Sequence, residues 1–271
     1  MTDSLNEAMA QIDPVRFGPD NRFRFRCHSK VSCFTQCCRG INIILTPYDI
    51  IQLKNRLNLS SDEFLAIYTQ PKILEKTDLP VVGLKLLDDE RQSCPFVRDD
   101  GCIVYTDRPT SCRYYPLGVA SLVHKEGADD EGFYFFVHES HCKGFEEDTE
   151  WRVRDWRKDQ GVDQHDEINA EWTDLVVRKR SFPANIKLTD KSKQMFFMAS
   201  YNIDQFRRFV FDSSFLDRYE VDPETVAAIR DDEVALLKFG LKWLRTVLFK
   251  VPGDTPLKQR DAGEKQAADG E

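Results

Sequence analysis

The sequence lacks the segments that direct a chain into or across a membrane. Its N-terminal stretch MTDSLNEAMAQIDPVRFGPD has no apolar run after a basic start, so no secretory signal is predicted. No run reaches the roughly 18–20 consecutive apolar residues that a membrane-spanning helix needs. We therefore expect a cytoplasmic protein with no membrane partner, in a compartment where thiols stay reduced.

A surplus of basic charge is also missing. The chain has 38 Lys and Arg residues against 46 Asp and Glu residues, which gives a net charge of −8. Nucleic-acid binding depends on a basic surface, so we expect no nucleic-acid partner. Hydrophobic residues at 41% and charged residues at 31% are typical of an ordinary globular protein, so a disordered chain is not expected either.

Cysteine, by contrast, is concentrated in the first part of the chain. The eight cysteines form two tight groups and one outlier, namely Cys27, Cys33, Cys37 and Cys38, then Cys94, Cys102 and Cys112, and finally Cys142. An even number of cysteines also permits disulfides, but a reducing compartment and a chain long enough to bury a core favour metal-bound thiolates. All eight are therefore candidate metal ligands.

The spacing of the first group excludes two common metal-binding patterns. There is no CxxC…CxxC zinc ribbon, and Gly40 stands where the third cysteine of a CxxxCxxC motif would fall. Zinc and iron–sulfur clusters both accept thiolates, and ligand softness does not separate them. The irregular spacing and the excess of sulfurs favour an iron–sulfur cluster over zinc. In extended backbone Cys37 and Cys38 would point to opposite faces, so they serve different centres or only one of them is a ligand.

Several polar residues lie next to the cysteines. His28 and His141 are alternative ligands, although a surface imidazole is the favoured interpretation for both. Three arginines, Arg39, Arg108 and Arg113, would lower thiol pKa values and offset the charge of a thiolate site. A role as solvated turn residues is equally compatible with their positions.

The cysteine segments together resemble a known family. The matching segments are CFTQCCR (33–39), CPF (94–96), CIVY (102–105), DRP (107–109) and CRYYP (112–116). In this combination the chain resembles the YkgJ-type cysteine-cluster family, which carries a CxxCxxCC signature, over roughly Arg26 to Phe145. The resemblance implies chelation of zinc or iron. The gaps here are five and three residues where the family has two and two, so the resemblance supports Cys27 less strongly than Cys37, Cys94, Cys102 or Cys112.

We expect an α+β fold, with a small antiparallel sheet, cysteine-rich metal-binding loops, N-terminal helices and a C-terminal helical layer. Helix-start signals occur at Thr46-Pro47 and Ser60, and no cysteine follows Cys142. Helical spacing is found at 151–159, 166–179, 191–211 and 222–249. The predicted organisation is a flexible lead-in (1–21), a cysteine-cluster metal-binding domain (22–150), a helical C-terminal extension (151–250) and a disordered tail (251–271).

Three functions remain open on the sequence alone. The first is a cytoplasmic metal-binding protein with a cysteine-ligated iron–sulfur or zinc centre. The second is a cluster-dependent enzyme, such as an oxidoreductase or, because flagellin lysine methylases resemble a related branch, a protein lysine methyltransferase. No GxGxxG motif follows a strand to bind a methyl donor. The third is a zinc-stabilised interaction module whose C-terminal helices bind a protein partner, although most such helices pack on their own domain.

Overall fold

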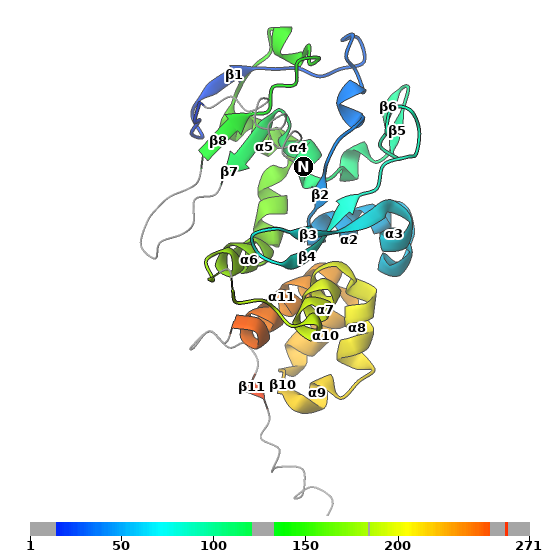
Figure 1. Cartoon of the computed structure of the whole chain (residues 1–271), viewed down its shortest axis with the longest axis vertical. Helices are drawn as coiled ribbons and strands as arrows, with labels where there is room; N and C mark the ends of the chain where they lie inside the picture. Colours follow the sequence, from blue (N-terminus) through cyan, green and yellow to red (C-terminus); the bar gives the residue numbers. More distant parts are fainter. Residues whose placement is uncertain (1–14, 121–132, 184, 250–257, 260–271) are drawn as a thin grey trace, which may run out of the picture.

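The computed structural model describes residues 15–120, 133–183, 185–249 and 258–259. Short strands and the cysteine-bearing loops lie at one end of the molecule, and a bundle of helices lies at the other (Figure 1). A three-stranded sheet with two helices stands between them. The predicted α+β class is confirmed. Within the described residues, no helix is both long enough and apolar enough to span a membrane.

The strands are short and all their pairings are antiparallel. The central sheet has the order β2-β4-β3, and the other sheets are the pairs β1-β9, β5-β6, β7-β8 and β10-β11. The strands are β1 (Arg22–Arg24), β2 (Ile44–Leu45), β3 (Thr69–Leu74), β4 (Leu79–Leu84), β5 (Val97–Arg98), β6 (Gly101–Cys102), β7 (Leu117–Ala120), β8 (Phe133–Phe136), β9 (Glu150–Arg152), β10 (Tyr219–Glu220) and β11 (Lys258–Gln259).

The helices are concentrated in the second half of the chain. They are α2 (Pro47–Arg56), α3 (Ser61–Tyr68), α4 (Thr110–Tyr114), α5 (Val153–Gln160), α6 (Val162–Arg180), α7 (Asp190–Tyr201), α8 (Ile203–Phe211), α9 (Phe215–Arg218), α10 (Pro223–Asp231) and α11 (Glu233–Phe249). Three short 3₁₀ helices are η1 (Gln36–Cys38), η2 (Tyr105–Asp107) and η3 (Gly144–Glu146).

Helices α2 and α3 begin where the sequence predicts. Thr46 and Ser60 each form a capping box, in which the side chain accepts the backbone N–H of the third helical residue and that residue's carboxylate accepts the N–H of the cap. Pro47 occupies the first turn of α2, where its missing N–H has no partner to lose. Local hydrogen bonds therefore determine both helix starts.

Two long predicted helices are each divided in two. The segment 191–211 is interrupted at Asn202, whose Oδ1 accepts the N–H of Gln205 at 3.2 Å and caps α8. The segment 222–249 is interrupted at Asp232, whose Oδ1 accepts the N–H groups of Val234 and Ala235. A short polar side chain that bonds to nearby backbone amides competes with the continuous helix and starts a new one.

A large hydrophobic cluster runs through both halves of the chain. It contains side chains of α2 and β4, such as Leu53 and Val82, together with Phe206 and Leu244 from the C-terminal helices. A second cluster, centred on Phe25 and Trp156, lies under β1 and α5. Phe23 of β1 and Phe25 just after it are buried, and the neighbouring arginines are exposed.

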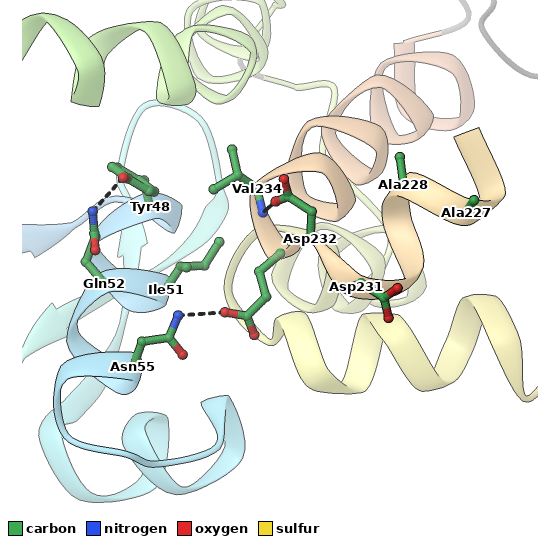
Figure 2. Close-up of a pocket in the computed structure, with 10 residues that line it drawn as sticks. Tyr48, Ile51, Gln52, Asn55, Ala227, Ala228, Asp231, Asp232 and Val234 are labelled. Atoms are coloured by element: carbon green, nitrogen blue, oxygen red, sulfur yellow. Dashed lines mark hydrogen bonds between the residues drawn. The ribbon is translucent and has the colours of Figure 1, made fainter. Parts of the chain in front are cut away.

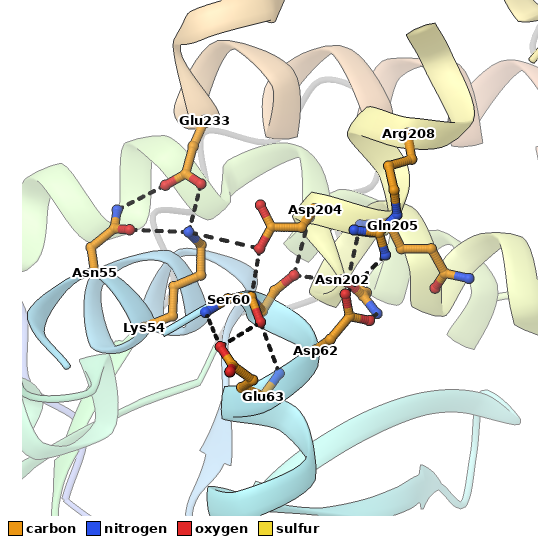
Figure 3. Close-up of polar contacts among 11 residues, drawn as sticks. Lys54, Asn55, Ser60, Asp62, Glu63, Asn202, Asp204, Gln205, Arg208 and Glu233 are labelled. Atoms are coloured by element: carbon orange, nitrogen blue, oxygen red, sulfur yellow. Dashed lines mark hydrogen bonds and ion pairs between the residues drawn. The ribbon is translucent and has the colours of Figure 1, made fainter. Parts of the chain in front are cut away.

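Polar contacts join the two halves at α2, α3, α8 and α11 (Figure 3). The buried Lys54 of α2 lies 2.6 Å from Glu233 Oε1 and 4.0 Å from Asp204 Oδ2. Ser61 donates its backbone N–H to Asp204 Oδ2 at 2.6 Å. Its hydroxyl donates to Asn202 Oδ1 at 2.7 Å. The helices next to the cysteine loops are therefore fixed against the C-terminal helices.

The predicted lead-in and tail fall largely outside the described residues. Residues 1–14 and most of 251–271 are among those that the structure does not describe. In the described part of the lead-in, Phe17 and Tyr134 exchange backbone hydrogen bonds of 2.8 and 2.9 Å. In the tail, Lys258–Gln259 pairs with β10.

Candidate metal centre

All eight cysteines are free thiols. They are carried by short elements at one end of the fold and by the loops between them: Cys27 and Cys33 follow β1, Cys37 and Cys38 lie in η1, Cys94 precedes β5, Cys102 ends β6, Cys112 lies in α4 and Cys142 follows β8. Short elements joined by tight turns place several sulfurs near each other because little chain entropy remains to be lost.

Backbone bonds bring η1 against the hairpin of β5 and β6. The N–H of Cys94 donates to the carbonyl of Cys38 at 2.8 Å, and Arg39 and Ser93 form an isolated bridge. Within the hairpin of β5 and β6, Cys102 is the partner of Val97, and its charge adds to the effect of burial in raising the pKa of the Cys94 thiol. Segments more than fifty residues apart in sequence thus meet at these sulfurs.

Helix α4 places Cys112 near Cys94 and Cys102. Its first residue, Thr110, donates its backbone N–H and its hydroxyl to Asp49 Oδ1 at 2.8 and 2.7 Å. His165 Nδ1 lies 2.9 Å from the same hydroxyl. Burial raises the pKa of the Cys112 thiol, and Cys94, Asp49, Cys102 and Cys37 raise it further.

Four of the cysteines are associated with the large hydrophobic cluster. Cys94 is a member of that cluster, and Cys38, Cys102 and Cys112 pack against it. We call Cys38, Cys94, Cys102 and Cys112 the inner group. Burial is the largest cause of the raised pKa at Cys94, which reaches about 11, and at Cys102.

The remaining four cysteines lie near one another. We call Cys27, Cys33, Cys37 and Cys142 the outer group. Cys27 is exposed as a residue, yet desolvation of its thiol and the charges of Cys37, Cys33 and Cys142 raise its pKa to about 11. Cys33 is buried, and its sulfur accepts the N–H of Lys143 at 3.1 Å. Burial raises the pKa of Cys142, with Cys33 and Cys37 contributing.

The adjacent Cys37 and Cys38 lie where the two groups meet. A hydrogen bond with Cys38 is the largest cause of the raised pKa of Cys37, followed by burial. Cys37 in turn raises the pKa of both Cys27 and Cys112. The backbone here is a 3₁₀ helix and not the extended strand assumed from sequence. Successive side chains along it are about 120° apart, which still directs the two sulfurs differently.

The arginines divide into two kinds. The positive charges of Arg98 and Arg108 partly offset the rise in the pKa of Cys102 that burial causes. Arg98 has the same effect on the pKa of Cys94. Arg98 was not among the residues predicted from sequence, although it belongs to the hairpin turn between two cysteines. Arg113 donates instead to the backbone oxygens of Arg108 and Gln160, at 3.0 and 2.8 Å, and so ties α4 to the end of α5.

The two histidines beside cysteines have different surroundings. His28 has a partner at each ring nitrogen, Glu147 Oε2 at 3.1 Å and the N–H of Lys30 at 3.2 Å. His141 Nε2 lies 3.5 Å from Glu139 Oε2, and both atoms are buried with no hydrogen-bond partner among the described residues. Glu139 was missed by the sequence analysis, although a carboxylate three residues before Cys142 was a visible signal.

The donor atoms present fit zinc or iron. Both metals accept thiolates. The buried Glu139 Oε2 has no hydrogen-bond donor among the described residues, and a metal cation would offset the cost of burying it. As the side chains stand, no three Cys, His, Asp or Glu side chains in the described part of the chain enclose a metal position. Ligation therefore requires side-chain rotation within a group and loss of thiol protons.

A groove lies apart from the cysteines, between α2 and the α10–α11 junction (Figure 2). It has a volume of about 630 Å³, and Tyr48, Gln52 and Asn55 face Asp231 and Asp232 across it. Gln52 donates to the Tyr48 hydroxyl at 2.5 Å. No cysteine lines the groove, so it is not part of the candidate metal centre.

Comparison with known proteins finds a family model that matches the cysteine segments. Residues 26–150 match the family model CxxCxxCC, described as "Putative zinc- or iron-chelating domain". No curated protein and no solved structure matches the chain significantly. The matched range contains every cysteine of the inner and outer groups. Over residues 26–150, the chain is therefore similar to the CxxCxxCC family.

Proposed function

We propose that this protein binds metal at two separate centres, one held by the inner group and one by the outer group. The observation that carries the proposal is the meeting of three segments at the inner group: the N–H of Cys94 donates to the carbonyl of Cys38 at 2.8 Å, and Cys94 and Cys102 add to the effect of burial in raising the pKa of Cys112. Thiols gathered in this way repel one another once they ionise, and a metal cation removes that repulsion. The ligands proposed are the eight cysteines already predicted from the sequence.

The inner centre is the structural one in this proposal. Its four thiols lie in or against the large hydrophobic cluster, and four thiolates complete either a zinc site or an iron–sulfur cluster. Arg98 and Arg108 supply positive charge beside it. Together with the irregular cysteine spacing, these cations favour the cluster over zinc. We place the protein in the cytoplasm, where eight free thiols remain reduced.

The proposed organisation follows the contacts. Residues 22–150 supply all the ligands, and the helical extension 151–250 supports them by sharing the large hydrophobic cluster. Helix α11 buries Leu237, Leu241 and Leu244 inside the protein's own core. No observation therefore favours the hypothesis that this helix serves chiefly to bind a protein partner.

The test is to purify the full chain without oxygen and measure its metals and its visible absorption. A brown protein with iron and sulfide supports the cluster at the inner centre, and a colourless protein with stoichiometric zinc contradicts it. Replacing Cys37 and Cys38 by serine, one at a time, should remove metal from different centres. If both variants lose the same single metal, the two-centre proposal is wrong.

A further inference from the structure

The turn that carries Cys142 also carries two polar atoms with no hydrogen-bond partner. The N–H of Cys142 donates to the carbonyl of Glu139 at 2.9 Å, which closes a tight turn over Glu139-Ser140-His141-Cys142. Within the described residues, the atoms Glu139 Oε2 and His141 Nε2 are buried and make no hydrogen bond, and at 3.5 Å they form an ion pair only when His141 is protonated. A carboxylate oxygen removed from water without a donor costs free energy that a neighbouring cation would offset.

Glu139 lies beside the outer group. Its charge raises the pKa of the Cys37 thiol and of the Tyr115 hydroxyl. The Tyr115 hydroxyl in turn lies next to Cys142 and lowers the pKa of that thiol. The Glu139 carboxylate, the thiols of Cys37 and Cys142 and the Tyr115 hydroxyl therefore lie near one another. The ammonium group of Lys143, the residue after Cys142, pairs with Glu146 at 2.7 Å.

The outer group contains the exposed Cys27, although Cys33 is buried and Cys37 and Cys142 are half-buried. No member of the inner group is exposed: Cys94 is buried, and the other three are half-buried and pack against the core. Structural zinc sites are closed by four protein ligands, whereas reactive sites keep a position that can exchange. An oxygen donor next to loop-borne thiols is typical of the second kind.

We propose that Glu139 supplies an oxygen ligand to the metal ion of the outer group, and that His141 orients this carboxylate through Nε2. The outer centre is then a mixed sulfur and oxygen site for a divalent zinc or iron ion, unlike the all-thiolate inner centre. Hard carboxylate oxygen beside soft thiolate weakens the preference for a cluster and allows ligand exchange. This inference rests on the proposed function, because it requires the outer thiols to bind metal.

Cobalt(II) is a suitable probe, because its absorption bands report thiolate ligation and site geometry. The full chain, freed of metal and kept without oxygen, is titrated with Co²⁺ while absorption and bound metal are measured. We expect two ions per wild-type chain. In Glu139→Gln, the outer ion should bind about ten- to hundredfold more weakly, as is usual when an oxygen ligand or its support is lost. The inner ion should bind unchanged, which also reports that the variant is folded.

Two further variants complete the test. Glu146→Gln is the matched control, because Glu146 belongs to the adjacent η3, is exposed and pairs with Lys143 at 2.7 Å. It should bind both ions as the wild type does. His141→Gln should weaken the outer ion less than Glu139→Gln and leave the number of thiolate bands unchanged.

The outcomes separate this inference from the proposed function. If Glu139→Gln binds the outer ion with wild-type affinity and spectrum, the role of Glu139 is wrong while the two thiolate centres stand. If the wild-type chain shows no thiolate–cobalt absorption, the proposed function fails and this inference fails with it. A single wild-type ion that Cys94→Ser abolishes and Cys142→Ser spares would also overturn the outer centre.

Discussion

Asp49 accepts both the backbone N–H and the hydroxyl of Thr110 through one carboxylate oxygen, Oδ1. The other oxygen, Oδ2, accepts the N–H of Thr46 at 2.8 Å and completes the capping box of α2. One fully buried side chain therefore starts α2 and fixes the helix that carries Cys112. The position of an inner-group sulfur depends on a residue more than sixty positions away in sequence.

The first prediction concerns this carboxylate. Asp49→Asn removes the charge and turns an amide N–H towards a backbone donor, so the free energy of unfolding should fall by about 1–3 kcal/mol. The inner metal should also bind more weakly, because α4 is less firmly held. Urea unfolding and metal analysis check both effects. Asp222→Asn is the control: Asp222 is the exposed N-cap of α10, where Asn and Asp are nearly equivalent.

The second prediction is that the free energy of unfolding of the metal-free chain depends on pH, and that bound metal removes this dependence. Burial raises the pKa of Cys27 and Cys94 from the ordinary value of 9.0 to about 11. The folded, metal-free chain thus holds these thiol protons more tightly than the unfolded chain does. Their contribution to stability is fully present below pH 9 and is lost as the pH rises through 11.

Urea unfolding of the metal-free and metal-loaded chains at several pH values between 8 and 11 measures this difference. Tyrosines with a raised pKa, such as Tyr134, also reduce the free energy of unfolding as the pH rises, but they do so in the metal-free and the metal-loaded chain alike. The difference in free energy between the two forms therefore reports the thiols. In the metal-loaded chain the ligands are already thiolates. The extra loss of stability that the metal-free chain shows at high pH should therefore be absent. Equal slopes for the two forms would contradict thiolate ligation.

The third prediction concerns metal removal. A metal that binds only the folded chain stabilises it by about 2.7 kcal/mol at a concentration one hundred times its dissociation constant. Cys112→Ser should abolish the inner share of this stabilisation, and Cys27→Ser only the outer share. Melting temperatures at increasing metal concentration would show it. Two variants with the same residual dependence on metal would mean that both sulfurs serve one site.

The local features of this fold were predictable from sequence, and the pairings between distant segments were not. The starts of α2 and α3 depend on hydrogen bonds within four residues, and the hairpin of β5 and β6 on the turn Asp99-Asp100-Gly101. By contrast, β1 pairs with β9, which places Arg22 opposite Arg152. No local pattern specifies such a partner, because the pairing is decided by which apolar faces pack together.

The same distinction applies to the cysteines. Their clustering in sequence correctly indicated one region of the molecule, but it did not give the two groups. Cys38 packs with the hairpin sulfurs against the large cluster, while its neighbour Cys37 raises the pKa of Cys27 and Cys142 in the outer group and of Cys112 in the inner group. Cys142 reaches the outer group because the chain returns after β8. Tertiary packing therefore decides which sulfurs lie near one another, and it also places Glu139 near Cys37.

The fourth prediction tests how strongly the helical extension supports the metal-binding region. Lys54 is 6% exposed at its side chain and lies between Glu233 and Asp204 (Figure 3). Lys54→Met should lower the free energy of unfolding by about 3 kcal/mol, because it leaves largely buried carboxylates without their cation. The double variant Lys54→Met/Glu233→Gln should recover part of that loss, since one uncompensated charge is removed with its partner. Unfolding that follows tryptophan fluorescence and metal release together gives the measurement. If the losses of stability in Lys54→Met and in Glu233→Gln, each measured alone, simply add in the double variant, Lys54 and Glu233 are not coupled. The contact between α2 and α11 then does not depend on this ion pair.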